Sequence, residues 1–263
     1  HNKFDNWRRN MLYFIGAGAG DPELLTIKGK RIIDNSDVII YTGSLVNKEL
    51  FNDIKVEAKL VNSASLSLDE VLEIIFDSNE KGLSIARVHT GDPAMYGAIR
   101  EQMVALDKKG IEYEVVPGVS SVFAGAAALK REFTLPGVTQ TMILTRMAGR
   151  TPVPEAESIE NLAKIQASMA IFLSIASIEE LANKLMTSYP KDTPAAVVYK
   201  ASWPDQKIIM STLENIAGEV KNADINKTAL VYVGRFLADE FELSKLYDKH
   251  FSHEFREAKD ARR

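Results

Sequence analysis

Short apolar runs alternate with amphipathic stretches along most of the chain. The run "MLYFIG", which starts at Met11, predicts a buried first strand because its apolar side chains are continuous and glycines follow it. Residues 22–34 then place leucines and isoleucines among charged residues, which is the pattern of a helix that buries one face. Because this alternation recurs, we predict an α/β fold with a largely parallel sheet.

The first half contains further predicted strands and helices. The strands are "DVIIY", "LSIARVH" and "IEYEVVPG", and the helices cover residues 67–82 and 94–109. Ser67 and Glu70 have the spacing of a capping box, which favours a helix start at this point.

The segment "REFTLPGVTQ" interrupts the alternation with Pro136 and Gly137. We therefore predict an N-terminal α/β domain over residues 11–134 and a C-terminal α/β domain over residues 138–237. Predicted strands of the second half are "TMILTRM", "MAIFLSI", "PAAVVYKA", "KIIMST" and "TALVYVG". The short connection near "WPDQ" predicts antiparallel neighbours, so the second sheet is expected to be mixed.

The two ends depart from this pattern. Residues 1–10 precede the first predicted strand, and we interpret them as a tag remnant or a flexible extension. In the tail, residues 238–263, apolar side chains recur at every fourth position at Leu243, Tyr247, Phe251 and Phe255. This spacing predicts a terminal amphipathic helix that docks on the body of the protein or on a partner subunit.

Composition narrows the classes of function. A formal net charge of −4 argues against bulk binding to nucleic acid or to an anionic membrane. The absence of cysteine excludes disulfides, thiol nucleophiles and thiolate metal sites, and His1, His250 and His253 stand near the ends, so no metal site is expected. No apolar run approaches the roughly 20 residues of a membrane helix, and we expect a cytoplasmic protein.

The glycine loop "GAGAGD", Gly16–Asp21, invites a comparison with nucleotide-binding loops. A dinucleotide fingerprint requires glycine where this chain has Asp21, and an acidic residue near the end of the second strand, where Tyr41 and Thr42 stand. Two interpretations remain open. The glycines either permit a tight turn between strand and helix and do nothing more, or they also approach a ligand.

Four motifs, taken together and in order, resemble the tetrapyrrole methylases. They are "YFIGAGAGDPELLTIKG", "RVHTGDPAMYGA", "VPGVSSVFAGAAAL" and "TQTMILTRMAGRTPVPE", and the resemblance runs from about Met11 to Leu237. It implies a class III methyltransferase with two α/β domains and S-adenosylmethionine (SAM) bound in a cleft between them. It also implies a homodimer and an acceptor that is a carboxylate-rich tetrapyrrole of corrin (vitamin B12) biosynthesis.

The resemblance assigns the cofactor contacts by motif. They are Ala19, Thr90, Gly91, Asp92, Met95, Ser120, Ser121, Leu173 and Ala201. The loop in relatives usually reads GAGPGD, and Ala19 stands in place of the proline. Because a proline restricts the unbound loop, we expect its loss to give a weaker or slower enzyme rather than a different one.

The chemistry of these residue types suits SAM. Gly91 permits close approach of a backbone, and Asp92 either caps the following helix and does nothing else or also helps to hold the donor. Met95 is a soft apolar residue that suits either an adenine or the protein core.

An acceptor with many carboxylates needs cationic anchors. Arg146 and Arg150, inside "TRMAGRTPVPE", are the best candidates because a guanidinium binds a carboxylate through two parallel hydrogen bonds. His89 is either a proton acceptor or donor, or a satisfied histidine of a strand. Further cations in or beside the motifs are Arg87, Arg100 and Lys200.

The reaction that the resemblance implies is direct methyl transfer. A ring carbon attacks the SAM methyl group in line with the departing sulfur, which leaves S-adenosylhomocysteine, and most of the rate comes from positioning. Three alternatives compete with this hypothesis: methylation at another tetrapyrrole position, a dinucleotide-dependent oxidoreductase, and a SAM-binding paralogue without turnover. The acidic residue missing after the second strand argues against the oxidoreductase.

Overall fold

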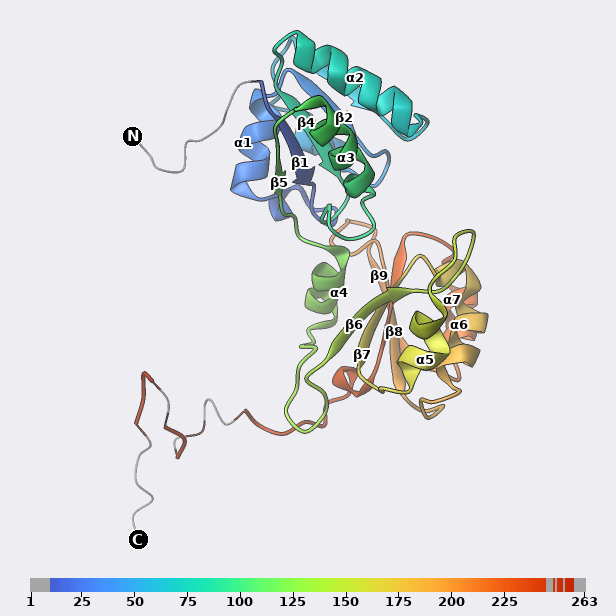
Figure 1. Ribbon diagram of the computed structural model, residues 1–263. Coiled ribbons are helices and arrows are strands. Elements are labelled where there is room, and N and C mark those ends of the chain that lie inside the picture. Colours follow the sequence, from blue (N-terminus) through green and yellow to red (C-terminus); the bar gives the residue numbers. More distant parts are fainter. Residues whose placement is uncertain (1–9, 245–247, 249, 253, 258–263) are drawn as a thin grey trace. The chain divides into compact units, whose positions relative to one another are not determined.

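The computed structural model describes residues 10–244, 248, 250–252 and 254–257, and these form two compact units (Figure 1). The first unit comprises the described residues up to Ala124 together with Lys200–Asp205. The second comprises Gly125–Tyr199 and the described residues from Gln206 onward. The chain passes from one unit to the other inside helix α4 (Ser121–Leu129), earlier than the boundary that we predicted near Pro136 and Gly137.

The first unit is built on a parallel sheet, as predicted. Its described strands are β1 (Leu12–Gly16), β2 (Val38–Tyr41), β3 (Lys59–Asn62), β4 (Ile85–His89) and β5 (Tyr113–Val116), in the order β3-β2-β4-β1-β5. Gly16 at the end of β1 lies opposite His89 at the end of β4. The loops that follow these two strands therefore leave the same edge of the sheet side by side.

Helices cover both faces of this sheet (Figure 1). They are α1 (Ile27–Asn35) on one face and α2 (Leu68–Glu80) and α3 (Ile99–Lys109) on the other. Ile33 of α1 packs in one core cluster, and Ile75 of α2 packs in the other with Leu106 of α3. Apolar side chains thus fill both faces of the central strands, which explains why β1 and β2 are continuous apolar runs.

The boundaries of the helices follow local chemistry. The capping box of Ser67 and Glu70 is confirmed at the start of α2. Helix α3 begins at Ile99, however, and not near Ala94 as predicted, because Tyr96 and Ala98 have left-handed backbone angles (φ of 55° and 50°) that a helix cannot contain.

The second unit contains the mixed sheet that the sequence predicts. Its described strands are β6 (Met142–Arg146), β7 (Ser168–Phe172), β8 (Pro194–Tyr199), β9 (Lys207–Thr212) and β10 (Ala229–Val233), in the order β6-β7-β10-β8-β9. Strands β6 and β7 are parallel, and the other pairs are antiparallel.

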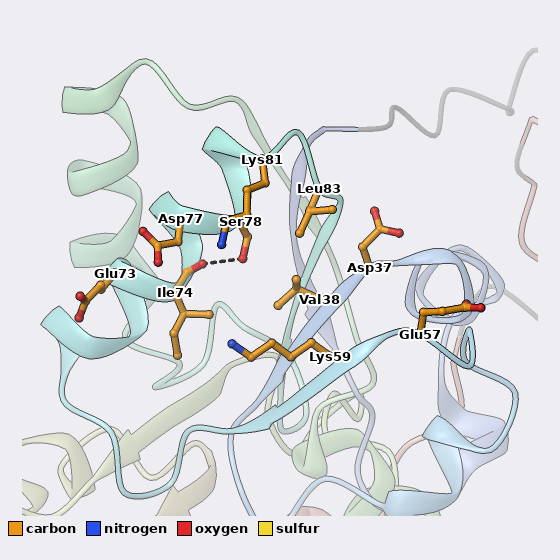
Figure 2. A pocket seen from close by; sticks show the side chains of 10 residues that line it. All are labelled: Asp37, Val38, Glu57, Lys59, Glu73, Ile74, Asp77, Ser78, Lys81 and Leu83. Atoms are coloured by element: carbon orange, nitrogen blue, oxygen red, sulfur yellow. Dashed lines mark hydrogen bonds between the residues drawn. The ribbon is translucent and has the colours of Figure 1, made fainter.

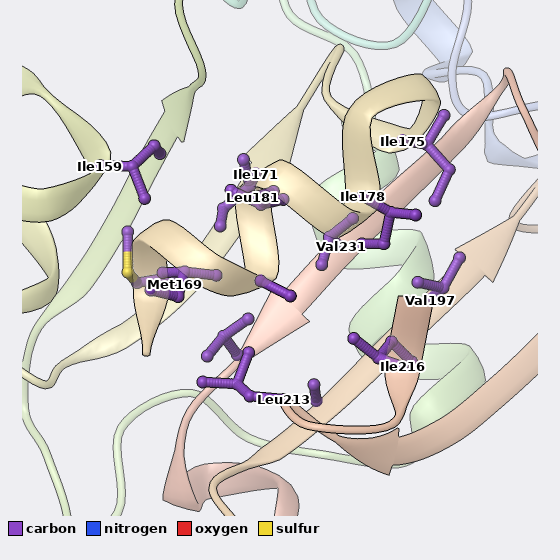
Figure 3. Close-up of a cluster of buried hydrophobic side chains, with 14 of the residues drawn as sticks. Ile159, Met169, Ile171, Ile175, Ile178, Leu181, Val197, Leu213, Ile216 and Val231 are labelled. Atoms are coloured by element: carbon purple, nitrogen blue, oxygen red, sulfur yellow. The ribbon is translucent and has the colours of Figure 1, made fainter. Parts of the chain in front are cut away.

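Helices α5 (Ile159–Ala163), α6 (Ile178–Leu185) and α7 (Ile216–Asn222) pack on this sheet over a buried apolar core (Figure 3). In this core Val231 of β10 lies opposite both Ile171 of β7 and Val197 of β8. Short 3-10 helices are Pro22–Leu24, Lys48–Phe51, Glu155–Glu157, Ile175–Ser177 and Arg235–Leu237.

The tail differs from its prediction. The residues after Leu237 that the structure describes form no helix, and Tyr247 lies outside the described residues. Leu243 and Phe255 are largely exposed, and a short amphipathic segment gains its helical stability chiefly by burying its apolar face. Within the described part of the chain, no helix has both the length and the apolar character needed to cross a membrane.

Candidate functional site

The loops that follow β1 and β4 are joined at the carboxyl edge of the first sheet. Gly18 and Gly91 exchange two backbone hydrogen bonds, of 2.8 and 3.3 Å, and the amide of Ala17 donates to the carbonyl of His89 at 2.7 Å. The carboxyl edge is where open α/β sheets bind their ligands. The glycine loop is therefore part of a two-loop structure and not an isolated turn.

Glycines are required at this edge because backbone segments from the loops after β1, β4 and β5 are in direct contact. A Cβ atom on Gly16 would stand 2.5 Å from the Cα atom of Gly118 and 2.6 Å from the carbonyl oxygen of Gly91. Gly91 also has a left-handed φ of 63°. Gly118, in "VPGV" after β5, did not stand out in the sequence, although its motif did. The close contact explains the glycines at positions 16 and 118, and the left-handed angle explains the glycine at position 91.

Asp92 connects the loop after β4 to the loop after β5. Its Oδ1 accepts a hydrogen bond from the amide of Ala94 at 2.8 Å, and its Oδ2 accepts one from the amide of Gly118 at 2.9 Å. It does not cap α3, whose N-cap residue is Ala98. The carboxylate instead fixes the separation of two loops, a long-range role that local sequence does not reveal.

Hydroxyl groups line the same edge. The amide of Thr90 donates to Oγ1 of Thr42 at 3.3 Å, and the two hydroxyl oxygens lie 3.3 Å apart. Ser120 is buried at the start of α4, and Gly91 lies close to it, since a Cβ on Gly91 would stand 3.7 Å from its Cα atom. Thr42, which follows β2, is a residue that the sequence analysis missed.

Lys200–Asp205, most of the connection between β8 and β9, supplies further parts of this site and is called the anchor loop below. Ala201 is buried in it, at 7% exposure. Ser202 and Trp203 contact the glycine loop at Asp21 and Ala19. Strands β8 and β9 belong to the second unit, but the anchor loop belongs to the first. The structure thus places Ala19, Thr90, Gly91, Asp92, Met95, Ser120, Ser121 and Ala201 in one unit.

The other candidates lie in the second unit. Arg146 ends β6, and its guanidinium donates to the carbonyls of Met147, Thr151 and Pro152 at 2.8–3.3 Å. Arg150, on the turn that these bonds hold, is exposed. Leu173 follows β7, is 75% exposed and has a left-handed φ of 53°. Because β6 and β7 are parallel neighbours, these three residues share one edge of the second sheet.

Comparisons with known proteins identify the family. A family model described as "Tetrapyrrole (Corrin/Porphyrin) Methylases" matches residues 11–217. The chain belongs to this family. The resemblance of the four motifs is thereby confirmed.

Full-length relatives of this methylase carry related names. The cobalt-precorrin-4 C(11)-methyltransferase of Methanocaldococcus jannaschii is 50% identical over 97% of this chain and 98% of its own. The precorrin-4 C(11)-methyltransferase of Pseudomonas aeruginosa is 46% identical over 93% of this chain and 98% of its own. The X-ray structure of a cobalt precorrin-4 methyltransferase superposes with a TM-score of 0.85 at 44% identity, covering 87% of this chain and 96% of that one.

Two motif residues of the methylase, Arg87 and His89, have side chains that are buried in the interior of the first unit. Arg87 is 6% exposed, and its guanidinium donates to Gln102, Ser63 and the carbonyl of Ile40. Burial lowers its pKa to about 10. His89 is 2% exposed, and its Nε2 has no hydrogen-bond partner among the described residues. The structure therefore does not bring either side chain to the surface where we expected an acceptor.

A cavity of about 410 Å³ lies elsewhere in the first unit of the methylase (Figure 2). Val38 and Lys59, the first residues of β2 and β3, line it with Asp77 of α2. It is therefore at the amino edge of the sheet, opposite the glycine loop. None of the residues that the sequence proposed for the site lines this cavity.

We predict that His89 makes the methylase less stable in acid. Burial, and next the positive charge of Arg87, lower its pKa from 6.5 to about 3, so the folded state stays neutral where the unfolded state binds a proton. Stability that is present above pH 6.5 is therefore lost as the pH falls toward 3. The loss from this group is about 1.4 kcal/mol at pH 5.5.

Urea unfolding at pH 7.5 and pH 5.5 tests this prediction. His89→Leu should lose less stability between the two pH values than the parent, by about that amount. His250→Gln, which replaces an exposed histidine, is the control and should follow the parent. An equal loss in His89→Leu and in the parent would contradict the prediction.

Proposed function

We propose that this chain transfers a methyl group from SAM to C11 of precorrin-4 or cobalt-precorrin-4, in corrin biosynthesis. The observation that carries the proposal is near-complete coverage by relatives of that name at 46–50% identity. The described fold agrees, with a TM-score of 0.85 to a cobalt precorrin-4 methyltransferase.

The carboxyl edge of the first sheet fits SAM. Close backbone contacts at Gly16 and Gly118 leave no room for side chains, and Gly91 has a left-handed backbone angle. An adenosyl group needs such flat polar backbone more than it needs a phosphate cradle. Residues proposed to hold the donor are Thr90, Gly91, Asp92, Met95, Ser120, Ser121 and Ala201. Leu173 carries over from the motif resemblance alone. When bound, SAM supplies a methyl group on a positively charged sulfur.

Each residue of this edge has a separate task in the proposal. Asp92 acts through the backbone, because its two oxygens hold the amides of Ala94 and Gly118 in place. The hydroxyl groups of Thr42 and Thr90 offer polar contacts beside Gly91. The described end of β2 has Tyr41 and Thr42 where a dinucleotide site has an acidic residue, which disfavours an oxidoreductase.

The acceptor carboxylates are proposed to bind at the edge of the second sheet. The bonds of Arg146 to three carbonyls hold the turn that carries Arg150, so Arg146 positions and Arg150 binds. Burial of His89 favours the structural one of the two roles left open for it, since a neutral ring at 2% exposure has no path to a substrate proton.

The proposed reaction forms a carbon–carbon bond and breaks a carbon–sulfur bond. The ring carbon gives the electron pair of the new carbon–carbon bond. The sulfur keeps the electron pair of the broken carbon–sulfur bond and leaves as part of S-adenosylhomocysteine. A proton leaves the macrocycle at another position. Holding the two reactants in line then accounts for most of the rate.

We also propose that the protein is cytoplasmic and works as a homodimer, which the family resemblance implies. Sedimentation velocity of the purified protein tests the dimer, and a single monomer boundary at micromolar concentration would contradict it.

The methyl acceptor is tested with isotopically labelled SAM and each substrate separately. We expect a product with one additional methyl group at C11, located by carbon NMR, from precorrin-4, cobalt-precorrin-4 or both. A methyl group on another carbon would place the chain with methylases of another tetrapyrrole position. Binding of S-adenosylhomocysteine without product from either substrate would indicate a paralogue without turnover, and binding of NAD in its place would indicate the oxidoreductase.

Substitution of the two arginines separates positioning from binding. We expect Arg150→Ala to raise the KM for the acceptor about 10-fold, because a charged hydrogen-bonded contact is lost, and to leave the KM for SAM unchanged. Arg146→Ala should raise the same KM and also lower the melting temperature. Lys191→Ala, which removes an exposed ion pair with Glu214 in the same unit, is the control. An unchanged acceptor KM in Arg150→Ala would refute this assignment.

A further inference from the structure

The last half of the glycine loop, Ala19–Asp21, is held from outside at every residue. The indole Nε1–H of Trp203 donates to the carbonyl of Ala19 at 3.0 Å. The side-chain amide of Asn47 donates to the carbonyl of Gly20 at 2.9 Å. The backbone amide of Asp21 donates to Oγ of Ser202 at 3.0 Å. Two of these three partners come from the anchor loop, more than 180 residues further along the chain.

Trp203 also determines which residue can stand at position 20. A Cβ atom on Gly20 would stand 2.1 Å from Nε1 of Trp203 and 2.2 Å from Cδ1, so the indole lies directly on the backbone of this glycine. Gly20 has a φ of 148°, a value that other residues rarely adopt. Packing and the hydrogen bond to Ala19 thus act together on two consecutive residues.

The anchor loop has a defined shape of its own. The amide of Trp203 donates to the carbonyl of Lys200 at 3.0 Å, and the ammonium group of Lys200 lies 2.6 Å from Asp205 and 5.8 Å from the centre of the indole ring. Lys200 and Ser202 both have left-handed φ angles, of 46° and 68°. Such angles are unfavourable for these residues and persist where surrounding contacts hold them. The loop therefore presents Ser202 and Trp203 in a fixed orientation.

The glycine loop, which contains three glycines, needs contacts from other parts of the chain to hold it in one conformation. Glycine has more accessible backbone conformations than other residues, so a position such as Gly20 would cost free energy to order on binding if no contact held it beforehand. Contacts that order a loop before the ligand arrives remove part of this cost and raise affinity. Ala19 contributes no restriction of its own, so its order depends on tertiary contacts such as the one from Trp203.

We propose that Trp203, with Ser202, is a positioning residue for the methyl donor, because it fixes the part of the glycine loop that borders the donor site. The inference rests on the proposed function, since it assigns SAM to this edge of the sheet. Trp203 acts through its contacts with Ala19 and Gly20, and these contacts raise the affinity for the methyl donor.

Calorimetry with S-adenosylhomocysteine measures this effect on the full chain. Trp203→Phe keeps an aromatic ring but removes the N–H donor, and we expect about 2- to 10-fold weaker binding. Trp203→Ala also removes the packing on Gly20, and we expect a loss of at least about 10-fold. Gly20→Ala displaces the indole by an independent route and should resemble Trp203→Ala. Trp7→Phe, the other tryptophan of the chain, is the matched control and should bind as the parent does.

Steady-state kinetics separate positioning from a general loss of structure. In Trp203→Phe the KM for SAM should rise while the KM for the acceptor and the melting temperature stay near the parent values. Parent-like affinity for S-adenosylhomocysteine in both Trp203 variants would overturn the inference. An equal rise of both KM values would also overturn it, because the loss would then not be specific to the donor.

Amide hydrogen exchange distinguishes a failure of this inference from a failure of the proposed function. If the parent protein binds no S-adenosylhomocysteine, the proposed function fails. The rate of amide hydrogen exchange at Gly20 and Asp21 then tests whether Trp203 holds the glycine loop in place. Faster exchange in Trp203→Ala than in Trp7→Phe supports the anchoring of the glycine loop, and equal exchange overturns it.

Discussion

The site depends on one constraint, which is the contact between backbones at the carboxyl edge of the first sheet. Gly16 ends β1 and Gly118 follows β5, and neither position has room for a β-carbon, while Gly91 after β4 has a left-handed φ of 63° and places its carbonyl oxygen against both. Once side chains are excluded there, Gly18 and Gly91 can pair through their backbones, and Asp92 can reach the amide of Gly118. The same contact that closes the edge of the sheet also leaves a surface of polar backbone atoms. Structural packing and the donor site that we propose therefore involve the same glycines.

Much of the fold follows from patterns that are local in sequence. Continuous apolar runs mark β1 and β2 because both faces of these strands are covered, and the capping box at Ser67 marks the start of α2. The start of α3 was misplaced because the left-handed angles at Tyr96 and Ala98 leave little trace in residue type. The spacing of the tail predicts a helix, whereas the described residues after Leu237 form none, because spacing alone does not supply a surface on which to pack.

The motifs of the family could be located from the sequence, but the contacts of single residues could not. Both interpretations that the sequence left open for Asp92 included a helix cap, which depends on the next few residues, whereas one of its two partners, Gly118, is distant in sequence. Arg87 and His89 have the composition of a site, yet the strand that carries them turns both toward the interior. Thr42, Ser202 and Trp203 were missed because their contacts join loops from separate parts of the chain.

Because of the anchor loop, the first unit is not one continuous segment of the chain. Strands β8 and β9 form a hairpin of the second unit, while the anchor loop between them belongs to the first. A fragment that ends at Ala124 would therefore lack part of its own unit, although it contains all the strands of the first sheet. An ordinary hairpin turn tolerates insertions and deletions among homologues. An insertion or deletion in the anchor loop would instead alter a loop of the first unit. The two units are thus compact in space without being separable segments of the coding sequence.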